Sequence, residues 1–258
     1  MKIFLTTALL SVAFAFQPTL THAADKPTVV LVHGAFADAS SWSGVISKLE
    51  SDGYTVVAVA NPLRGVKSDG DYLRRIVQGI KTDVVLVGHS YGGSVINDAA
   101  AASKNVKSLV FVAAFAPEKG ESAGDLSGKF PGSTLGPTLA EPVALENGGK
   151  DLYIQQAKFH DQFAADVSKA EAKIMAATQR PIAEAARTEP AAVAAWKTLP
   201  SWFVYGDADK NIPAAALSWM AERAKSKETV VVKGASHVVM ISHPAAVAKV
   251  IENAAAAK

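Results

Sequence analysis

The chain has 258 residues, of which 49% are hydrophobic and 19% charged, as is typical of one globular domain with a full core. Its formal net charge of +2 gives no reason to expect nucleic acid or an anionic membrane surface as a partner. Cysteine is absent, which excludes disulfides and thiolate ligands, and no two histidines have the short spacing of a helical zinc site. We therefore predict no metal.

The first 23 residues have the three parts of a secretory signal peptide. Lys2 gives a basic start, residues 3–16 are almost entirely apolar, and Thr21-His22-Ala23 places small residues before a cleavage site. The apolar run is too short to span a bilayer comfortably, which disfavours the alternative of a retained membrane anchor. We expect the segment to be removed and the mature chain, from Ala24 or Asp25, to be exported to the periplasm or the medium without a membrane partner.

Beyond the signal segment, apolar runs alternate with helical patterns. The runs are apolar throughout rather than at every second position, as in a parallel sheet that helices cover on both faces. Six strands are predicted, at residues 28–33, 54–60, 84–87, 106–114, 201–205 and 229–233. Helices are predicted near residues 40–51, 71–80, 91–103, 213–224 and 244–257.

The alternation stops between the fourth and fifth predicted strands. Residues 117–197 show no strong strand pattern, and a loop rich in Gly, Pro and Ser is followed by helical patterns near 151–166, 168–178 and 190–197. Such a segment is too long for a connection inside a compact domain. We therefore predict one domain, residues 24–258, with a helical cap inserted at about 117–197.

A G-x-S-x-G sequence, Gly88-His89-Ser90-Tyr91-Gly92, stands between the third strand and the helix that follows it. On a strand-to-helix turn this sequence is typical of a nucleophile elbow, in which small glycines allow a sharp turn and the serine backbone is strained. The hydroxyl then lies at a helix N-terminus, where free backbone N–H groups can bind an oxyanion. Ser90 is the predicted nucleophile, and a chance occurrence of the string in a loop is the alternative.

A serine nucleophile needs a base, and the base needs an acid that holds its tautomer. His237 follows the last predicted strand and is the predicted base, whereas His243 precedes Pro244 and is assigned to a turn. The acid should follow the fifth strand, where Asp207 and Asp209 both qualify by position.

An oxyanion hole needs two N–H donors. Tyr91, which follows the nucleophile, supplies the first in our prediction. The loop after the first strand supplies the second, with Ala35 as the predicted donor and Phe36 as the alternative. His33 in the same loop is assigned to holding the loop by hydrogen bonds rather than to the reaction.

Four motifs thus follow predicted strands: His33-Gly34-Ala35-Phe36, Gly88-His89-Ser90-Tyr91-Gly92-Gly93, Gly206-Asp207-Ala208-Asp209 and Gly234-Ala235-Ser236-His237. Together they resemble the α/β-hydrolase superfamily, over about residues 27–257. Within it the chain resembles the small bacterial serine esterases related to plant methylesterases and hydroxynitrile lyases. The resemblance implies an α/β-hydrolase fold with an about six-stranded, mainly parallel sheet, no cofactor and ester hydrolysis through an acyl-enzyme. Its G-x-x-D pattern with a following proline favours Asp209 as the acid and a structural role for Asp207.

The predicted function is therefore that of an exported serine hydrolase that cleaves small to medium carboxylic esters. One alternative is a carbon–carbon lyase of the hydroxynitrile type, although Val238 stands where such lyases look to need a lysine. A perhydrolase-type activity and a ligand-binding protein with slow turnover are further alternatives. Epoxide hydrolases and haloalkane dehalogenases of this fold use an aspartate nucleophile, so Ser90 argues against both.

Large apolar side chains are the candidates for a substrate pocket. Those near the catalytic motifs and in the cap are Phe36, Phe115, Val238, Phe159, Phe163 and Trp196. Ordinary packing between cap and core is an equal alternative for each. A mostly neutral, aromatic pocket of this kind would suit apolar acyl or aryl groups.

Overall fold

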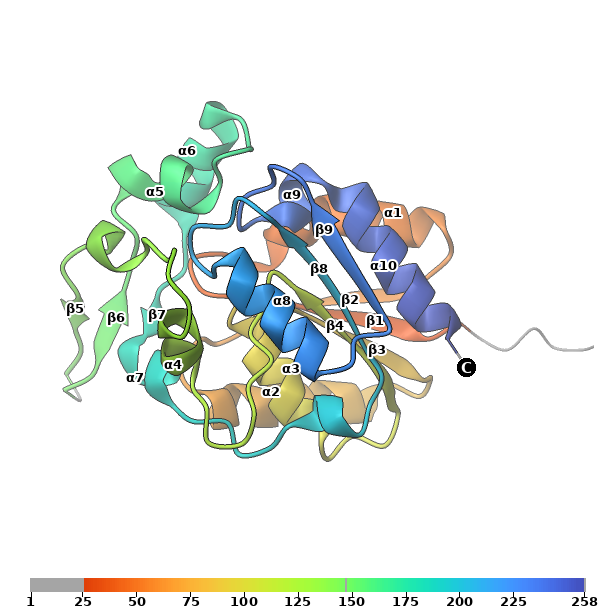
Figure 1. Ribbon diagram of the computed structural model, residues 1–258. Helices are drawn as coiled ribbons and strands as arrows, with labels where there is room; N and C mark the ends of the chain where they lie inside the picture. The colour runs from red at the N-terminus through yellow and green to blue at the C-terminus, as the bar shows by residue number, and fades with distance from the viewer. Residues whose placement is uncertain (1–25, 147, 258) are drawn as a thin grey trace, which may run out of the picture.

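The computed structural model describes residues 26–146 and 148–257 (Figure 1). The predicted signal segment, residues 1–23, lies outside the described residues. A six-stranded parallel sheet in the order β2-β1-β3-β4-β8-β9 forms the centre of the molecule, which confirms the predicted fold class. Its strands are β1 (Thr28–Val32), β2 (Val56–Val59), β3 (Val84–His89), β4 (Val106–Val112), β8 (Ser201–Gly206) and β9 (Glu228–Val232). Among the described helices, none has the length and apolarity that crossing a membrane requires.

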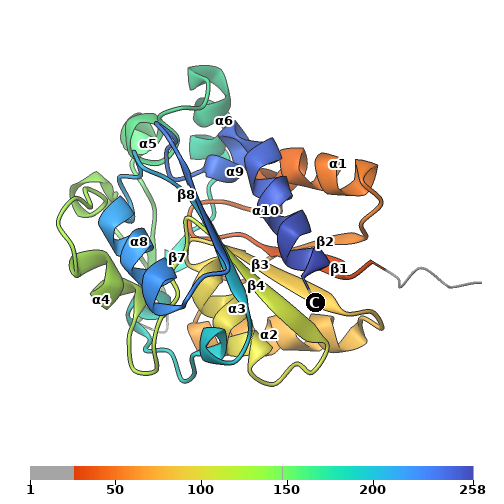
Figure 2. The same cartoon turned by 45° about the vertical axis from the view of Figure 1, so that its right-hand side comes forward.

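Helices cover both faces of this sheet (Figures 1 and 2). One face carries α1 (Ser43–Ser51) and α10 (Pro244–Ala256), which pack against each other, with the short α9 (Val239–Ser242) beside them. The other face carries α2 (Val66–Gly79), α3 (Gly92–Ala100) and α8 (Ala214–Arg223). Because both faces are covered, β1, β3 and β8 are buried at every position, which explains their continuous apolar runs.

The helix α2 begins at Val66, earlier than the pattern predicts, because side chains elsewhere in the fold bind its first N–H groups. The Glu189 carboxylate, from the cap, accepts from the N–H groups of Val66 and Lys67 at 2.6 and 3.2 Å. A carboxylate at this end also interacts favourably with the helix dipole. The start of α2 is therefore determined by a tertiary contact.

The cap between β4 and β8 is less helical than the sequence predicts. It contains the helices α4 (Ala123–Gly128), α5 (Gln156–Phe163), α6 (Lys169–Thr178) and α7 (Glu184–Thr188). Two 3-10 turns, η2 (Gly136–Thr138) and η3 (Ala195–Lys197), also belong to the cap, whereas the turn η1 (Ala39–Trp42) lies in the core before α1. The cap also contains an antiparallel sheet of β5 (Val143–Ala144), β6 (Lys150–Leu152) and β7 (Ile182–Ala183), in that order. Strands of two or three residues are too short to leave a periodic pattern, which is why the sequence did not indicate them.

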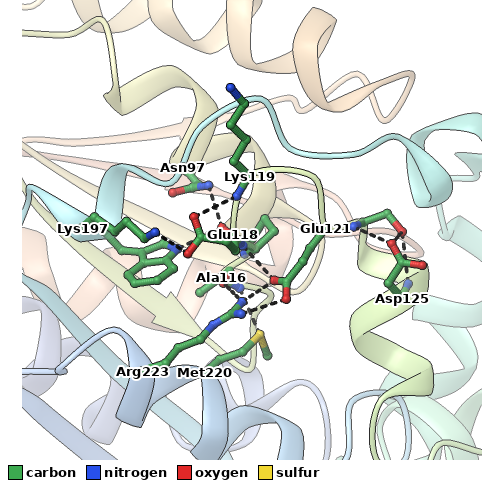
Figure 3. Close-up of polar contacts among 12 residues, drawn as sticks. Asn97, Ala116, Glu118, Lys119, Glu121, Asp125, Lys197, Met220 and Arg223 are labelled. Atoms are coloured by element: carbon green, nitrogen blue, oxygen red, sulfur yellow. Dashed lines mark hydrogen bonds and ion pairs between the residues drawn. The ribbon is translucent and has the colours of Figure 1, made fainter.

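A polar cluster fastens the first residues of the cap to the core (Figure 3). The Arg223 guanidinium, at the end of α8, donates to the Ala116 carbonyl and pairs with the Glu121 carboxylate, each at 2.6 Å. Lys197, near the end of the cap, pairs with Glu118 near its beginning at 2.5 Å. Both boundaries of the cap are thereby joined to each other and to α8.

Asn97 joins the same two boundaries to α3. Its buried amide donates to the carbonyls of Pro117 and Val193 at 3.3 and 2.8 Å and accepts from the Ala195 N–H at 2.7 Å. These contacts use both N–H donors of the Asn97 side chain and one of the two lone pairs of its amide oxygen. The helix that follows Ser90 is therefore attached directly to the cap.

We expect Gly88→Ala to destabilise the fold strongly. An added Cβ would lie 2.5 Å from the Gly92 carbonyl oxygen and 2.8 Å from the Gly93 nitrogen, and this backbone cannot move without opening the turn. Overpacking of this kind costs about 3 kcal/mol or more of unfolding free energy. Gly79→Ala is the matched control, because no atom lies within 4 Å of its added Cβ. Urea unfolding should show the control unchanged or more stable by up to about 1 kcal/mol, and equal losses in both variants would contradict the packing argument.

Candidate active site

Ser90 lies on the turn between β3 and α3 with a φ of +53°, in the left-handed region that a residue with a Cβ rarely adopts. Three backbone hydrogen bonds maintain this conformation. The Ser90 N–H donates to the Val112 carbonyl at 3.3 Å, and its own carbonyl accepts from Gly93 and Phe115 at 3.0 and 3.2 Å. The strain is therefore held by β4 and the loop after it.

His237 and Asp209 meet as a fully buried pair. The Nδ1 atom of His237 lies 2.6 Å from Oδ2 of Asp209, and neither side chain is exposed. The other carboxylate oxygen accepts from the N–H groups of Asn211 and Ile212 at 2.7 and 3.0 Å. Because the carboxylate accepts, the proton of a neutral His237 lies on Nδ1 and leaves Nε2 as a basic lone pair.

The Nε2 atom of His237 is buried and has no hydrogen-bond partner among the described residues. A buried polar atom without a partner is costly, and its presence calls for a functional explanation. An acceptor of this kind is what a general base needs before it takes a proton.

Asp207, the competing carboxylate, lies in the turn beside this pair. Its side chain accepts from the Gly234 N–H at 2.5 Å and is exposed. The contact joins the loop after β8 to the loop that carries His237, so Asp207 is in a position to brace the turn rather than to orient the imidazole. His243, the other histidine near this end of the chain, hydrogen-bonds the Ser242 hydroxyl at the start of α10.

His89 supports the pair from the residue before Ser90. Its Nε2–H donates to the His237 carbonyl at 3.1 Å, and the two rings lie 4.8 Å apart between centroids. Burial, with His237 as a second cause, holds the pKa of His89 well below its ordinary value. His89 is therefore neutral. The Phe163 ring packs against both histidine rings, with its centroid 5.2 Å from that of His237 and 6.4 Å from that of His89.

Two free backbone N–H groups lie beside Ser90. In residues 26–146 and 148–257, neither the Ala35 nor the Tyr91 N–H donates to a protein acceptor, and both residues line the same pocket as Ser90. The Phe36 N–H, in contrast, donates to the Arg180 carbonyl at 3.0 Å. Of the two alternatives in this loop, the structure leaves only Ala35 free for an oxyanion.

His33 holds the loop that carries Ala35. Its Nδ1–H donates to the Gly34 carbonyl at 2.9 Å, and its Nε2 accepts from the Asn61 N–H at 3.1 Å. The Asn61 amide in turn donates to the His33 carbonyl at 2.9 Å. Burial lowers the pKa of His33 to about 4, which keeps the ring neutral and the tautomer fixed.

Asp69 is a supporting residue that sequence reasoning missed. This buried carboxylate on α2 accepts hydrogen bonds from the Tyr91 hydroxyl at 2.9 Å and from the Arg64 N–H at 3.0 Å. Burial raises the pKa of the Asp69 carboxyl, and these hydrogen bonds oppose the change. Tyr91 is thus held at its hydroxyl as well as by its backbone. No local pattern connects two residues on successive helices, so only the packing of α2 against α3 reveals the contact.

A pocket with about 590 Å³ of empty space, its open mouth included, lies over Ser90. The core lines it with Phe36, Phe115 and Ile212, among others, and the cap with Leu135, Ile182 and Arg187. Two of the predicted pocket residues, Phe36 and Phe115, are thus in the lining. In the described part of the chain, no three His, Cys, Asp or Glu side chains converge on a position that could hold a metal ion.

The other four predicted pocket residues do not line this pocket. They pack inside the protein instead, so the prediction is corrected for them. Phe159, Phe163 and Val238 are fully buried, and Phe163 fills the space between Phe36 and His237. Trp196 is buried at the cap boundary, where its indole N–H donates to the Pro117 carbonyl at 2.9 Å. Amphipathic spacing marks such residues as buried but does not tell burial in the core from contact with a cavity.

Comparison with known proteins agrees with this architecture. The model of the alpha/beta hydrolase family matches residues 29–250. An alpha-hydroxynitrile lyase of Arabidopsis thaliana is 27% identical over 85% of this chain and 93% of its own length. Methylesterase 1 of the same plant is 25% identical over 85% of this chain and 92% of its own length.

The fold of a polyneuridine aldehyde esterase superposes with a TM-score of 0.76 at 20% identity, over 89% of this chain and 99% of that one. At this identity the likeness concerns the fold alone. The family match extends over nearly the whole described chain and includes both the turn at Ser90 and the loop of His237. The chain therefore belongs to the alpha/beta hydrolase family.

Proposed function

We propose that this protein is a serine esterase that hydrolyses carboxylic esters through an acyl-enzyme, with Ser90 as nucleophile, His237 as base and Asp209 as the orienting acid. The observation that carries the proposal is the unpartnered, buried Nε2 of His237, whose Nδ1 is held by Asp209 beside the strained turn of Ser90. Relatives named as methylesterases support the same reaction class.

The geometry supports the following sequence of steps. His237 Nε2 takes the Ser90 hydroxyl proton as Oγ attacks the ester carbonyl, and Asp209 stabilises the imidazolium. The N–H groups of Ala35 and Tyr91 bind the oxyanion of the tetrahedral intermediate. The imidazolium then gives its proton to the leaving alcohol, and water, deprotonated by His237, releases the acid from Ser90.

Some relatives are named for other reactions, among them the alpha-hydroxynitrile lyase and a methylketone synthase of known structure. Val238, the residue after the base, is apolar and fully buried, so it offers no positive charge to a departing anion. This supports hydrolysis over lyase chemistry. Slow-turnover binding is distinguished from hydrolysis by the turnover measurements below.

Ser90→Ala should retain the fold and lose about four to six orders of magnitude in turnover, as removal of a triad nucleophile does. Hydrolysis of phenyl acetate and labelling by a fluorophosphonate are the two measurements. Ser94→Ala is the matched control, because Ser94 is also buried with an unpartnered hydroxyl, one turn along α3. Labelling that persists in Ser90→Ala, or that maps to Ser94, would refute the assignment.

Asp209→Asn should reduce kcat by about 10⁴-fold, because an amide cannot hold the Nδ1–H tautomer of His237. Asp207→Asn removes the acceptor charge at Gly234 and should alter thermal stability more than turnover. Steady-state kinetics and melting temperatures of both variants make the comparison. If Asp207→Asn had the larger effect on kcat, the acid would be the wrong carboxylate of the pair.

We also propose that the protein is exported, on the basis of its basic start, apolar run and small-residue cleavage site. N-terminal sequencing of protein recovered from the periplasm or the medium should begin at Ala24 or Asp25. Since the chain has no cysteine, its activity should be unaffected by reducing agents. Recovery of the protein with Met1 retained would contradict export with cleavage.

A further inference from the structure

Arg187, on α7 of the cap, is the one charged residue among the described residues that line the pocket over Ser90. Its side chain is half-buried, and its guanidinium forms no hydrogen bond or ion pair with any described residue. A guanidinium that loses part of its hydration needs compensating acceptors. A ligand bound in the pocket over Ser90 can supply such acceptors.

Three carboxylates that lie close to Arg187 in the chain or on the helix packed against α7 are engaged elsewhere. Glu184, one turn earlier on α7, faces Lys150 at 3.9 Å, and Glu189 binds the first N–H groups of α2. Asp125, on the neighbouring helix α4, forms a capping box with Ser122. Figure 1 shows α4 and α7 side by side in the cap, and none of these three acids pairs with Arg187.

Two other polar side chains of the pocket, Asn211 and Ser133, offer free donors as well. Asn211 uses its amide oxygen to accept from Gln162 at 2.7 Å, and its NH₂ group has no acceptor among the described residues. The Ser133 hydroxyl also lines the pocket without a partner in the described part of the chain. No described lining residue carries a carboxylate. Free donors and a positive charge, with no carboxylate beside them, form a site for an anion.

We propose that the substrate of this site is an ester that carries a second, ionised carboxylate, which Arg187 binds through its planar fork of N–H groups. The inference rests on the proposed esterase function and names its substrate class. Apolar lining residues, among them Phe36, Phe115, Leu135 and Ile182, suit an alkyl or aryl spacer between the carboxylate and the ester. Apart from Arg187, the residues that line the pocket are uncharged, in keeping with the mostly neutral pocket that the sequence suggested.

The carboxylate takes no part in bond making. Ser90 Oγ forms the acyl bond, the alcohol leaves with the proton from His237, and water then restores Ser90 and releases the acid. The anion can therefore belong to either product. On the acyl side the substrate is a half-ester of a dicarboxylic acid, and on the alcohol side it is an ester of a hydroxy acid.

Two matched pairs of esters separate these sources of the anion. Monomethyl adipate and methyl heptanoate test the acyl side, and para-acetoxybenzoate and phenyl acetate test the alcohol side, with acid release followed by pH-stat titration. The enzymes compared are wild type, Arg187→Gln, Arg187→Lys and the control Arg75→Gln. Arg75 is an exposed, unpaired arginine on α2 that does not line the pocket, within the described residues.

In at least one pair, the ratio of kcat/KM for the anionic ester to that for the neutral ester should fall about 10–100-fold in Arg187→Gln, mostly through KM. Arg187→Lys should retain part of the ratio, and Arg75→Gln should leave it unchanged. Added salt should lower the wild-type ratio. If the ratio is the same in wild type and Arg187→Gln for both pairs, the anion site is refuted while the esterase function stands.

A binding measurement tells failure of the anion site at Arg187 from failure of the proposed esterase function. Calorimetry with monomethyl adipate and para-acetoxybenzoate on Ser90→Ala should show binding that the double variant with Arg187→Gln loses. If wild type binds these esters through Arg187 but cleaves none of the four, the anion site stands and the esterase function is wrong. If neither ester binds and neither anionic ester is preferred, the inference is overturned.

Discussion

The turn between β3 and α3 is the constraint on which the rest of the structure depends. A residue with a Cβ takes a left-handed conformation there only if its surroundings leave it no other. Ser90 meets this condition because β4 and the Phe115 loop bind its backbone, and because Gly88 and Gly34 leave room where a Cβ would collide. The order of β1, β3 and β4 in the sheet brings these partners to one place. The result is a hydroxyl held in a fixed position over the sheet.

Around this turn, burial keeps the supporting histidines neutral. The pKa of both His33 and His89 is lowered chiefly by burial, so at neutral pH neither places a positive charge beside His237. A proton taken from Ser90 would then create the only imidazolium in this group, next to the buried Asp209 carboxylate. The hydrogen bonds of the neutral rings meanwhile hold the Ala35 loop and the His237 backbone.

The cap and the core contribute different parts of the pocket. The core supplies Ser90 and the free N–H groups, and the cap supplies Arg187 and part of the apolar lining. These parts are joined at Asn97, whose amide binds both cap boundaries from the helix that follows Ser90, and at Glu189, whose carboxylate binds α2. The residues that we propose for the reaction and for binding the substrate anion thus lie in separate segments of the chain, which polar contacts hold together.

The sequence by itself determined the six strands, the turn at Ser90 and the loops that hold Asp209 and His237. These features are local, because continuous apolar runs and glycine spacing express themselves within a few residues. The motifs favoured Asp209, Ala35 and Tyr91, but only the tertiary structure showed that Asp209 meets His237, that the N–H groups of Ala35 and Tyr91 stay free and that Phe163 packs where a ligand contact was expected. It alone also revealed the short strands of the cap and the unpaired Arg187. Each of these features depends on residues that lie far apart in the chain. Burial and pairing arise when such residues pack together, so a local sequence pattern does not determine them.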